Sequence, residues 1–237
     1  MNKQREPVIR NTDESQLFGI IAAFVAVLVT LAIFLIWRRR KSVGKNILLT
    51  GLSDAGKTVL YTKLFSSKSI RTHTSVKENV GNIVINDKTL QIVDIPGHER
   101  LRYKFFDKYK NSARGLIYVI DSVTLSKDIR DAAEFLYTLL SDEVMQKDIS
   151  VLILCNKQDQ TMAKGCGIVQ TLLEKEINLL RLTKMNQLEA TDSTSANSFV
   201  GKQGKDFEFS HLVNKVDFAE GSVSDIDQVK LWLEKVV

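Results

Sequence analysis

Residues 37–58 read WRRRKSVGKNILLTGLSDAGKT, and this stretch decides the fold of the 237-residue chain. Its middle part, NILLT at residues 46–50, is a short apolar run that ends at a glycine, as a buried strand does. From Thr58 onward, TVLYTKLF places Val59, Leu60 and Leu64 near helical spacing. The stretch therefore predicts a strand, a glycine-containing turn and a helix, directly behind a cluster of cations.

The turn between the predicted strand and helix matches the pattern GxxxxGK[ST]. Its glycines let backbone N–H groups approach phosphate oxygens, and the helix directs its positive end at the anion. Lys57 would supply a cation to the outer phosphates, and Thr58 a hydroxyl to Mg²⁺. An incidental glycine turn is the alternative, but the strand–helix context argues against it. The predicted phosphate-binding residues are Gly51, Leu52, Ser53, Asp54, Ala55, Gly56, Lys57, Thr58 and Val59.

Two further motifs follow apolar runs. Asp94 and Gly97 come after LQIV, where a carboxylate can hold the Mg²⁺ shell and a glycine N–H can meet a terminal phosphate. Asn156, Lys157 and Asp159 come after VLILC. A carboxylate at Asp159 can accept from the N1–H and 2-amino groups of guanine, a donor pair that adenine lacks. Each motif alone is unspecific, but three at strand ends predict one site at the carboxyl edge of a sheet.

The remaining pattern completes an α/β fold. Residues 82–85 and 90–93 predict a hairpin, and residues 115–120, 151–154 and 215–218 predict further strands. Residues 129–140, 164–182 and 226–237 predict helices. This alternation predicts a P-loop domain over residues 46–237 with a mostly parallel sheet. Residues 183–205 are rich in Ser, Thr, Asn and Gly and predict a flexible insertion or a surface loop.

An uncharged apolar run of 21 residues occupies residues 17–37. As a helix it would span roughly 30 Å, the thickness of a bilayer's hydrocarbon core. A cleaved signal peptide is the alternative, but its apolar core is usually shorter. Four cations follow at residues 38–41, and Lys/Arg bias keeps the richer flank cytosolic. We predict a short lumenal tail (1–16), a single transmembrane helix (17–37) and a basic cytosolic linker (38–45).

Charge and cysteine content narrow the function further. The net charge is +5, but residues 1–43 hold seven Lys/Arg and three Asp/Glu, whereas residues 44–237 hold 26 and 25. The basicity thus lies beside the apolar run, which favours a membrane surface over direct binding of nucleic acid. Two cysteines, Cys155 and Cys166, are too few for a disulfide framework and fit a reducing compartment.

The order GLSDAGKT, DIPGHE, NKQD resembles the Ras/Arf-like small GTPases over residues 44–237. With the N-terminal span, SARGLIYVIDS, CNKQD and FEFS, the chain resembles the family of signal recognition particle receptor β subunits. The resemblance implies nucleotide contacts at Thr72, His73, Thr74 and Ser75, with Thr74 on Mg²⁺. It also implies guanine contacts at Ser222 and Val223, although the family's usual lysine is missing there. His98 occupies the place of the glutamine that orients the attacking water.

The resemblance implies a GTP/GDP- and Mg²⁺-binding protein of the endoplasmic reticulum membrane with slow hydrolysis. Its expected partner is the receptor's peripheral α subunit, and through it the signal recognition particle and the ribosome. An Arf-like GTPase that recruits coat proteins is one alternative, although such proteins use reversible anchors. A tether that holds nucleotide permanently is another, because binding motifs do not determine hydrolysis.

Overall fold

The computed structural model describes residues 20–21, 23–31, 44–66, 75, 77–147, 149–190 and 200–237. The chain divides into two compact units, residues 1–43 and 44–237. The described residues of the first unit are helical, and their apolar side chains, Phe24 among them, are exposed. The predicted tail, span and linker lie wholly or partly outside the described residues. Within the described part, no helix has both the length and the apolar character needed to cross a membrane.

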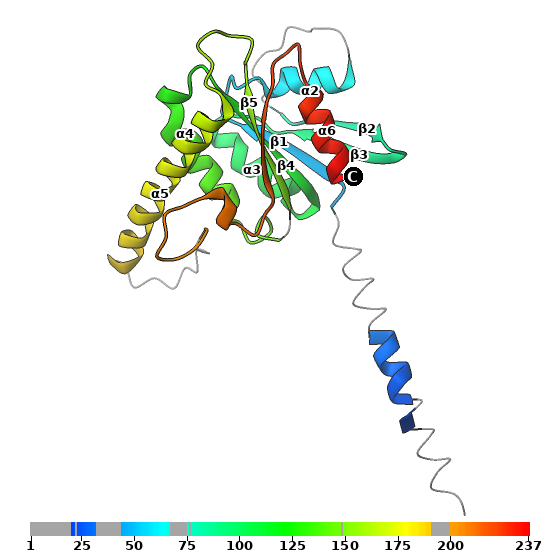
Figure 1. The fold of residues 1–237 in the computed structure, drawn as a ribbon. Coiled ribbons are helices and arrows are strands. Elements are labelled where there is room, and N and C mark those ends of the chain that lie inside the picture. Colours follow the sequence, from blue (N-terminus) through cyan, green and yellow to red (C-terminus); the bar gives the residue numbers. More distant parts are fainter. Residues whose placement is uncertain are drawn as a thin grey trace, which may run out of the picture. The chain divides into compact units, whose positions relative to one another are not determined.

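The second unit is built on a six-stranded sheet in the order β2-β3-β1-β4-β5-β6 (Figure 1). All neighbouring pairs are parallel except β2 with β3. This is the mostly parallel α/β sheet that the sequence predicts. The strands are β1 (Asn46–Gly51), β2 (Asn79–Ile85), β3 (Lys88–Asp94), β4 (Ala113–Asp121), β5 (Ser150–Asn156) and β6 (Val216–Glu220).

Helices cover both faces of this sheet (Figure 1). One face packs against α2 (Lys57–Phe65) and α6 (Asp227–Val236), and the other against α3 (Glu99–Tyr109), α4 (Leu125–Leu140) and α5 (Cys166–Ala190). Side chains of a strand alternate between its faces, so Ile47 and Leu49 of β1 join the α2–α6 side while Leu48 joins the other. The two buried faces explain why β1, β4 and β5 read as continuous apolar runs.

The predicted hairpin is confirmed as β2 and β3, joined at Asn86 and Asp87. Both residues have positive φ, at 50° and 60°. A two-residue loop with positive φ at both positions matches the twist of paired strands, and Asn and Asp tolerate that conformation. The pairing extends back to Asn79, which lies opposite Asp94. The hairpin thereby brings its first residue to the end of β3.

Helix α3 is not among the helices that the sequence pattern predicts. Its sequence, ERLRYKFFDKY, contains six charged residues, and one of its two buried positions is Arg102. The other, Phe106, lies one helical turn away. An arginine at a core-facing position interrupts the apolar stripe on which periodicity relies. The helix can therefore be recognised only when its packing is known.

The segment at residues 183–205, predicted as a flexible insertion or a surface loop, is helical at its start. Helix α5 continues to Ala190. Residues 191–199 lie outside the described residues, but Val200 is 2% exposed and belongs to the core on the α5 side. Arg181 of α5 donates through Nη2 to the carbonyl oxygens of Lys202 and Lys205, at 2.8 and 3.3 Å. Polar composition concealed about two turns of helix and the hydrogen bonds that hold the segment at residues 200–205.

Candidate functional site

The predicted motifs meet at the carboxyl edge of the sheet. β1 lies between β3 and β4, and the loops that follow β1, β3 and β5 converge on an open cavity with about 720 Å³ of empty space. Pro96 is a lining residue that the sequence analysis does not predict. The predicted residues that line the cavity are Ser53, Asp54, Gly56, Lys57, Thr58, Val59, Ser75, Gly97, Asn156, Lys157 and Val223.

Two glycines keep the loops close together. Gly56 has φ +94°, and a methyl group there would lie 2.3 Å from Nδ2 of Asn156. A methyl group at Gly97 would lie 2.6 Å from both Nζ of Lys57 and the backbone nitrogen of Ser53. No larger residue fits at either position without displacing the loops. The backbone around the cavity is therefore bare and close to the lysine, as a phosphate site requires.

Lys57 is a buried cation at the start of α2. Its side chain is 6% exposed, and Nζ donates to the carbonyl oxygen of Leu52 at 2.6 Å. Burial lowers the pKa of Lys57 to about 8, against the opposing attraction of Asp94 and Asp54. Within the described residues it forms no ion pair closer than 4 Å. A desolvated cation beside a cavity at a helix N-terminus is suited to receive an anion.

Asp94, at the end of β3, lies in a cluster of side-chain oxygen atoms that could bind a metal ion. Its Oδ2 accepts from Oγ1 of Thr58 at 2.8 Å and from Nδ2 of Asn79 at 2.9 Å. Oγ of Ser75 lies 3.0 Å from that of Thr58. Burial raises the pKa of Asp94, although these hydrogen bonds and Lys57 oppose the rise. Its Oδ1 is buried and accepts no hydrogen bond from the described residues.

Mg²⁺ fits this donor set, because it prefers carboxylate and hydroxyl oxygens and an unpartnered carboxylate oxygen is costly in a protein interior. Of the predicted ligands, Thr58 and Asp94 are among the described residues. A Mg²⁺ ion bound to them would neutralise phosphate charge. Thr74, the third predicted ligand, lies outside the described residues, as do Thr72 and His73. Asn79 was not predicted, because nothing in its local sequence marks it as lying opposite Asp94.

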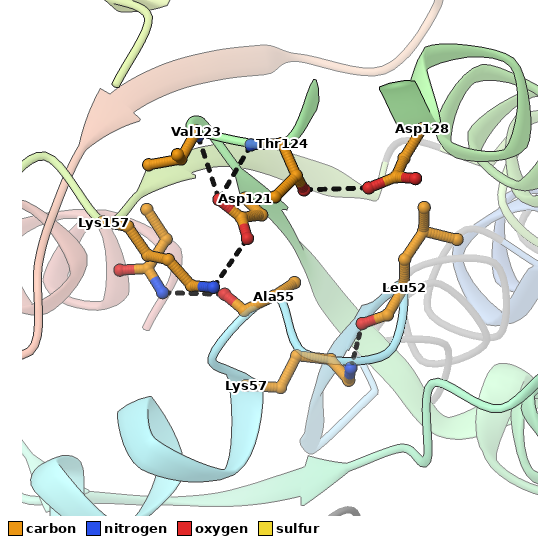
Figure 2. A network of polar contacts seen from close by, with 9 residues as sticks. Leu52, Ala55, Lys57, Asp121, Val123, Thr124, Asp128 and Lys157 are labelled. Atoms are coloured by element: carbon orange, nitrogen blue, oxygen red, sulfur yellow. Dashed lines mark hydrogen bonds and ion pairs between the residues drawn. The ribbon is translucent and has the colours of Figure 1, made fainter. Parts of the chain in front are cut away.

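The loop after β5 is bound to its neighbours by the network in Figure 2. Nδ2 of Asn156 donates to the carbonyl oxygen of Ala55 at 2.8 Å. Lys157 has a left-handed backbone, with φ +65°, and its Nζ lies 2.6 Å from Oδ2 of Asp121. The other oxygen of Asp121 accepts from the backbone N–H of Val123. Asp121 was missed by sequence reasoning, because a carboxylate at the end of a predicted strand does not identify its partner, which lies 36 residues further along the chain.

The predicted guanine-binding residues come from two loops that touch each other. The backbone N–H of Gln158 donates to the carbonyl oxygen of Gly221 at 3.1 Å. Asp159, next to it, is exposed, whereas Ser222 is buried and its Oγ accepts from the N–H of Asp225 at 3.1 Å. The contact between the loops fixes the position of Val223 at the cavity.

His98 is the N-cap of α3. Its Nδ1 accepts from the backbone N–H of Arg100 at 3.3 Å, its ring is exposed, and it is not among the residues that line the cavity. A capping role therefore accounts for the polar side chain at this position. Its role in positioning water stays a prediction.

Comparison with known proteins agrees with this geometry. The chain matches the family described as signal recognition particle receptor beta subunit over residues 42–216. It is 39% identical to the human signal recognition particle receptor subunit beta, over 96% of this chain and 89% of that protein. It is 32% identical to bovine ADP-ribosylation factor-like protein 5A, over 63% of this chain and 78% of that protein.

The solved structure of the mammalian SRP receptor contains a chain of the same fold. The two superpose with a TM-score of 0.73 at 39% identity, covering 81% of this chain and all of that one. The α/β sheet described above is thus a GTPase-like fold. The chain is a member of the signal recognition particle receptor beta subunit family.

Proposed function

We propose that this chain is the membrane-anchored GTP-binding subunit of a signal recognition particle receptor. In its GTP-bound form it docks the peripheral α subunit at the endoplasmic reticulum membrane, for co-translational targeting of secretory and membrane proteins. The observation that carries the proposal is the convergence of the loops after β1, β3 and β5 on one cavity, in a chain of this family. The apolar run at residues 17–37 supports the permanent anchor.

The physical basis of the switch is local. Thr58 and Asp94 are bound to Ser75 and Asn79, which lead into β2. Nucleotide and Mg²⁺ at Thr58 and Asp94 would change this set of hydrogen bonds. The positions of Ser75 and Asn79 would thus depend on the terminal phosphate, and a partner that contacts these residues would bind one nucleotide state better.

A detergent pull-down with the full-length chain tests the proposal. The chain is loaded with a non-hydrolysable GTP analogue or with GDP and offered the peripheral receptor subunit. We expect recovery mainly with the analogue, at least about tenfold above GDP if docking follows the switch. Equal recovery in both states would instead support the permanent tether. Recovery of coat proteins without the receptor subunit would overturn the proposal in favour of an Arf-like function.

Asp159→Asn serves as the specificity variant in the same assay. An amide offers a donor where the carboxylate accepts. This variant should therefore recover less of the receptor subunit with the GTP analogue. Recovery should return when the variant is loaded with the corresponding xanthosine triphosphate analogue. Asp87→Asn in the β2–β3 turn is the matched control, since Asn tolerates the left-handed conformation there. It should behave as the unmodified chain does.

A further inference from the structure

Two thiols lie next to each other at the base of the loop that carries Asn156, Lys157 and Asp159. Cys155 belongs to β5 and Cys166 is the first residue of α5. They are the two cysteines of the chain, and their Sγ atoms are 3.0 Å apart. Because they stand on either side of residues 156–165, a bond between them would close this loop into a ring.

The two thiols differ in the way that a reactive dithiol requires. Cys166 is partly exposed, whereas Cys155 is fully buried. The hydrogen bond between the two sulfurs lowers the pKa of Cys166, and the same interaction, together with burial, raises the pKa of Cys155. The carboxylate of Glu220 accepts from the backbone N–H of Cys166 at 2.8 Å and opposes the lowering. The accessible sulfur is thus the better thiolate, and the buried one keeps its proton.

The pair also lies where the two predicted guanine-binding loops join. The carbonyl oxygen of Cys155 accepts from the N–H of Gly221 at 3.0 Å, and Gly221 in turn accepts from Gln158. Glu220, bound to the N–H of Cys166, ends β6 just before the second loop. A change in the distance between Cys155 and Cys166 therefore acts on both loops.

We propose that Cys155 and Cys166 form a peroxide-sensitive dithiol, and that the disulfide formed from them restrains the 156–165 loop and slows release of bound nucleotide. The first half of this proposal concerns the two thiols alone. The second half rests on the proposed nucleotide-binding function.

The reaction needs hydrogen peroxide as its oxidant. The Cys166 thiolate attacks one peroxide oxygen, the O–O bond breaks, and Cys166 becomes a sulfenic acid while hydroxide takes up a proton as water. The Cys155 sulfur then attacks the Cys166 sulfur and displaces hydroxide, which leaves as water with the proton of Cys155. In total, two thiols and one peroxide give one disulfide and two waters. A thiol reductant reverses the change, as expected for a redox-sensing pair in a reducing compartment.

The expected effect follows from geometry. A disulfide brings two sulfurs to about 2.05 Å, roughly 1 Å closer than the present separation. Cys155 is held on both sides by β4 and β6, so the start of α5 and the loop before it must move. A loop that has to open before the base leaves would open less often once it is closed into a ring.

The test uses the full-length chain in detergent, loaded with fluorescent GDP. The protein is treated with peroxide and then with an alkylating reagent, and its peptides are weighed. We expect a peptide in which Cys155 and Cys166 are joined, with two hydrogens lost and no alkylation. Release of the fluorescent nucleotide should slow by at least about threefold and recover after dithiothreitol.

Cys166→Ser is the control, because it changes a partly exposed sulfur to an oxygen and leaves the buried thiol in place. Its release rate should match that of the reduced chain and should not respond to peroxide. Two alkylated cysteines after peroxide would overturn the dithiol, and a disulfide with an unchanged release rate would overturn the coupling. A reduced chain that never retains the nucleotide would instead refute the proposed function and the coupling to nucleotide release. The masses of the peptides would still decide whether Cys155 and Cys166 form a disulfide.

Discussion

At the residue scale, Lys57 shows how a binding site opposes the stability of its own fold. The ammonium group is buried, and Leu52 gives it one carbonyl oxygen in place of water. Desolvation of an ion costs more than one neutral acceptor returns. A bound anion would therefore offset this desolvation cost. We expect the nucleotide-free protein to be destabilised by this side chain.

Replacing Lys57 with Met should stabilise the nucleotide-free protein at pH 7 by about 1–3 kcal/mol, measured by urea unfolding. The pKa of Lys57 is about 8 in the fold and 10.5 as its ordinary value. Between these values the unfolded chain binds more protons, so the stability of the unmodified protein rises with pH and the advantage of the variant shrinks. Lys63→Met, on the same helix, is the matched control. An advantage of Lys57→Met that stays undiminished above the ordinary value of 10.5 would contradict the desolvation account.

The sequence predicts site residues well where a motif carries its own chemistry. The sequence predicts Lys57, Asp94 and Asn156, because a strand end and a fixed spacing suffice to assign them to the site. Asp121 and Asn79 are not predicted, because their roles depend on which side chain faces them across the sheet edge. Asp121 is defined by Lys157, which is 36 residues away.

At the element scale, α5 holds the segment at residues 200–205 through a contact that composition does not show. Arg181 is 4% exposed, and its guanidinium binds two carbonyl oxygens of that segment. It also lies over the ring of Phe207, 5.8 Å from the centroid. These contacts hold the returning chain against the helix.

Arg181→Met should lower the free energy of unfolding by about 1–3 kcal/mol, since two carbonyl groups lose a charged donor. Its neighbour Leu182 is 53% exposed, and Leu182→Ala should change stability by less than about 0.5 kcal/mol. Chemical denaturation of both variants makes the comparison. Equal losses would indicate that the segment at residues 200–205 is not fastened by the guanidinium.

Elements with an unbroken or regularly periodic apolar pattern are predictable, and an element whose apolar stripe is interrupted by a buried charge is not. β1, β4 and β5 are buried on both faces, so their runs of Leu, Ile and Val mark them without ambiguity. α3 buries Arg102 among its core contacts, and a buried arginine reads as solvent-facing until its contacts are known. Tertiary contacts, rather than propensity, decide this element.

At the scale of the whole molecule, the boundary after residue 43 separates the apolar run from the cavity. The residues that line the cavity belong to the unit of residues 44–237, and the apolar run lies in the other unit. The proposed anchoring and nucleotide binding should therefore be separable.

Removing residues 1–43 should move the protein from the membrane pellet to the supernatant in alkaline carbonate extraction. Its nucleotide affinity should stay within about twofold, because the residues that line the cavity belong to the unit of residues 44–237. Replacing only residues 38–41 by serines keeps the apolar run and serves as the control, which should remain in the pellet. If the shortened protein stays with the membrane, the anchor lies elsewhere in the chain.

The position of β1 has a mechanical consequence. This strand follows Lys45 directly and is bonded along its length to parallel neighbours, β3 and β4. A force applied at Lys45 along the strand would load the hydrogen bonds of β1 to β3 and to β4 in shear. These hydrogen bonds would share the load rather than open one after another. Forced unfolding is set by the unfolding rate, and an entry through the centre of the sheet keeps that rate low. The domain is thus joined to the preceding part of the chain by a strand that is hydrogen-bonded along both of its edges.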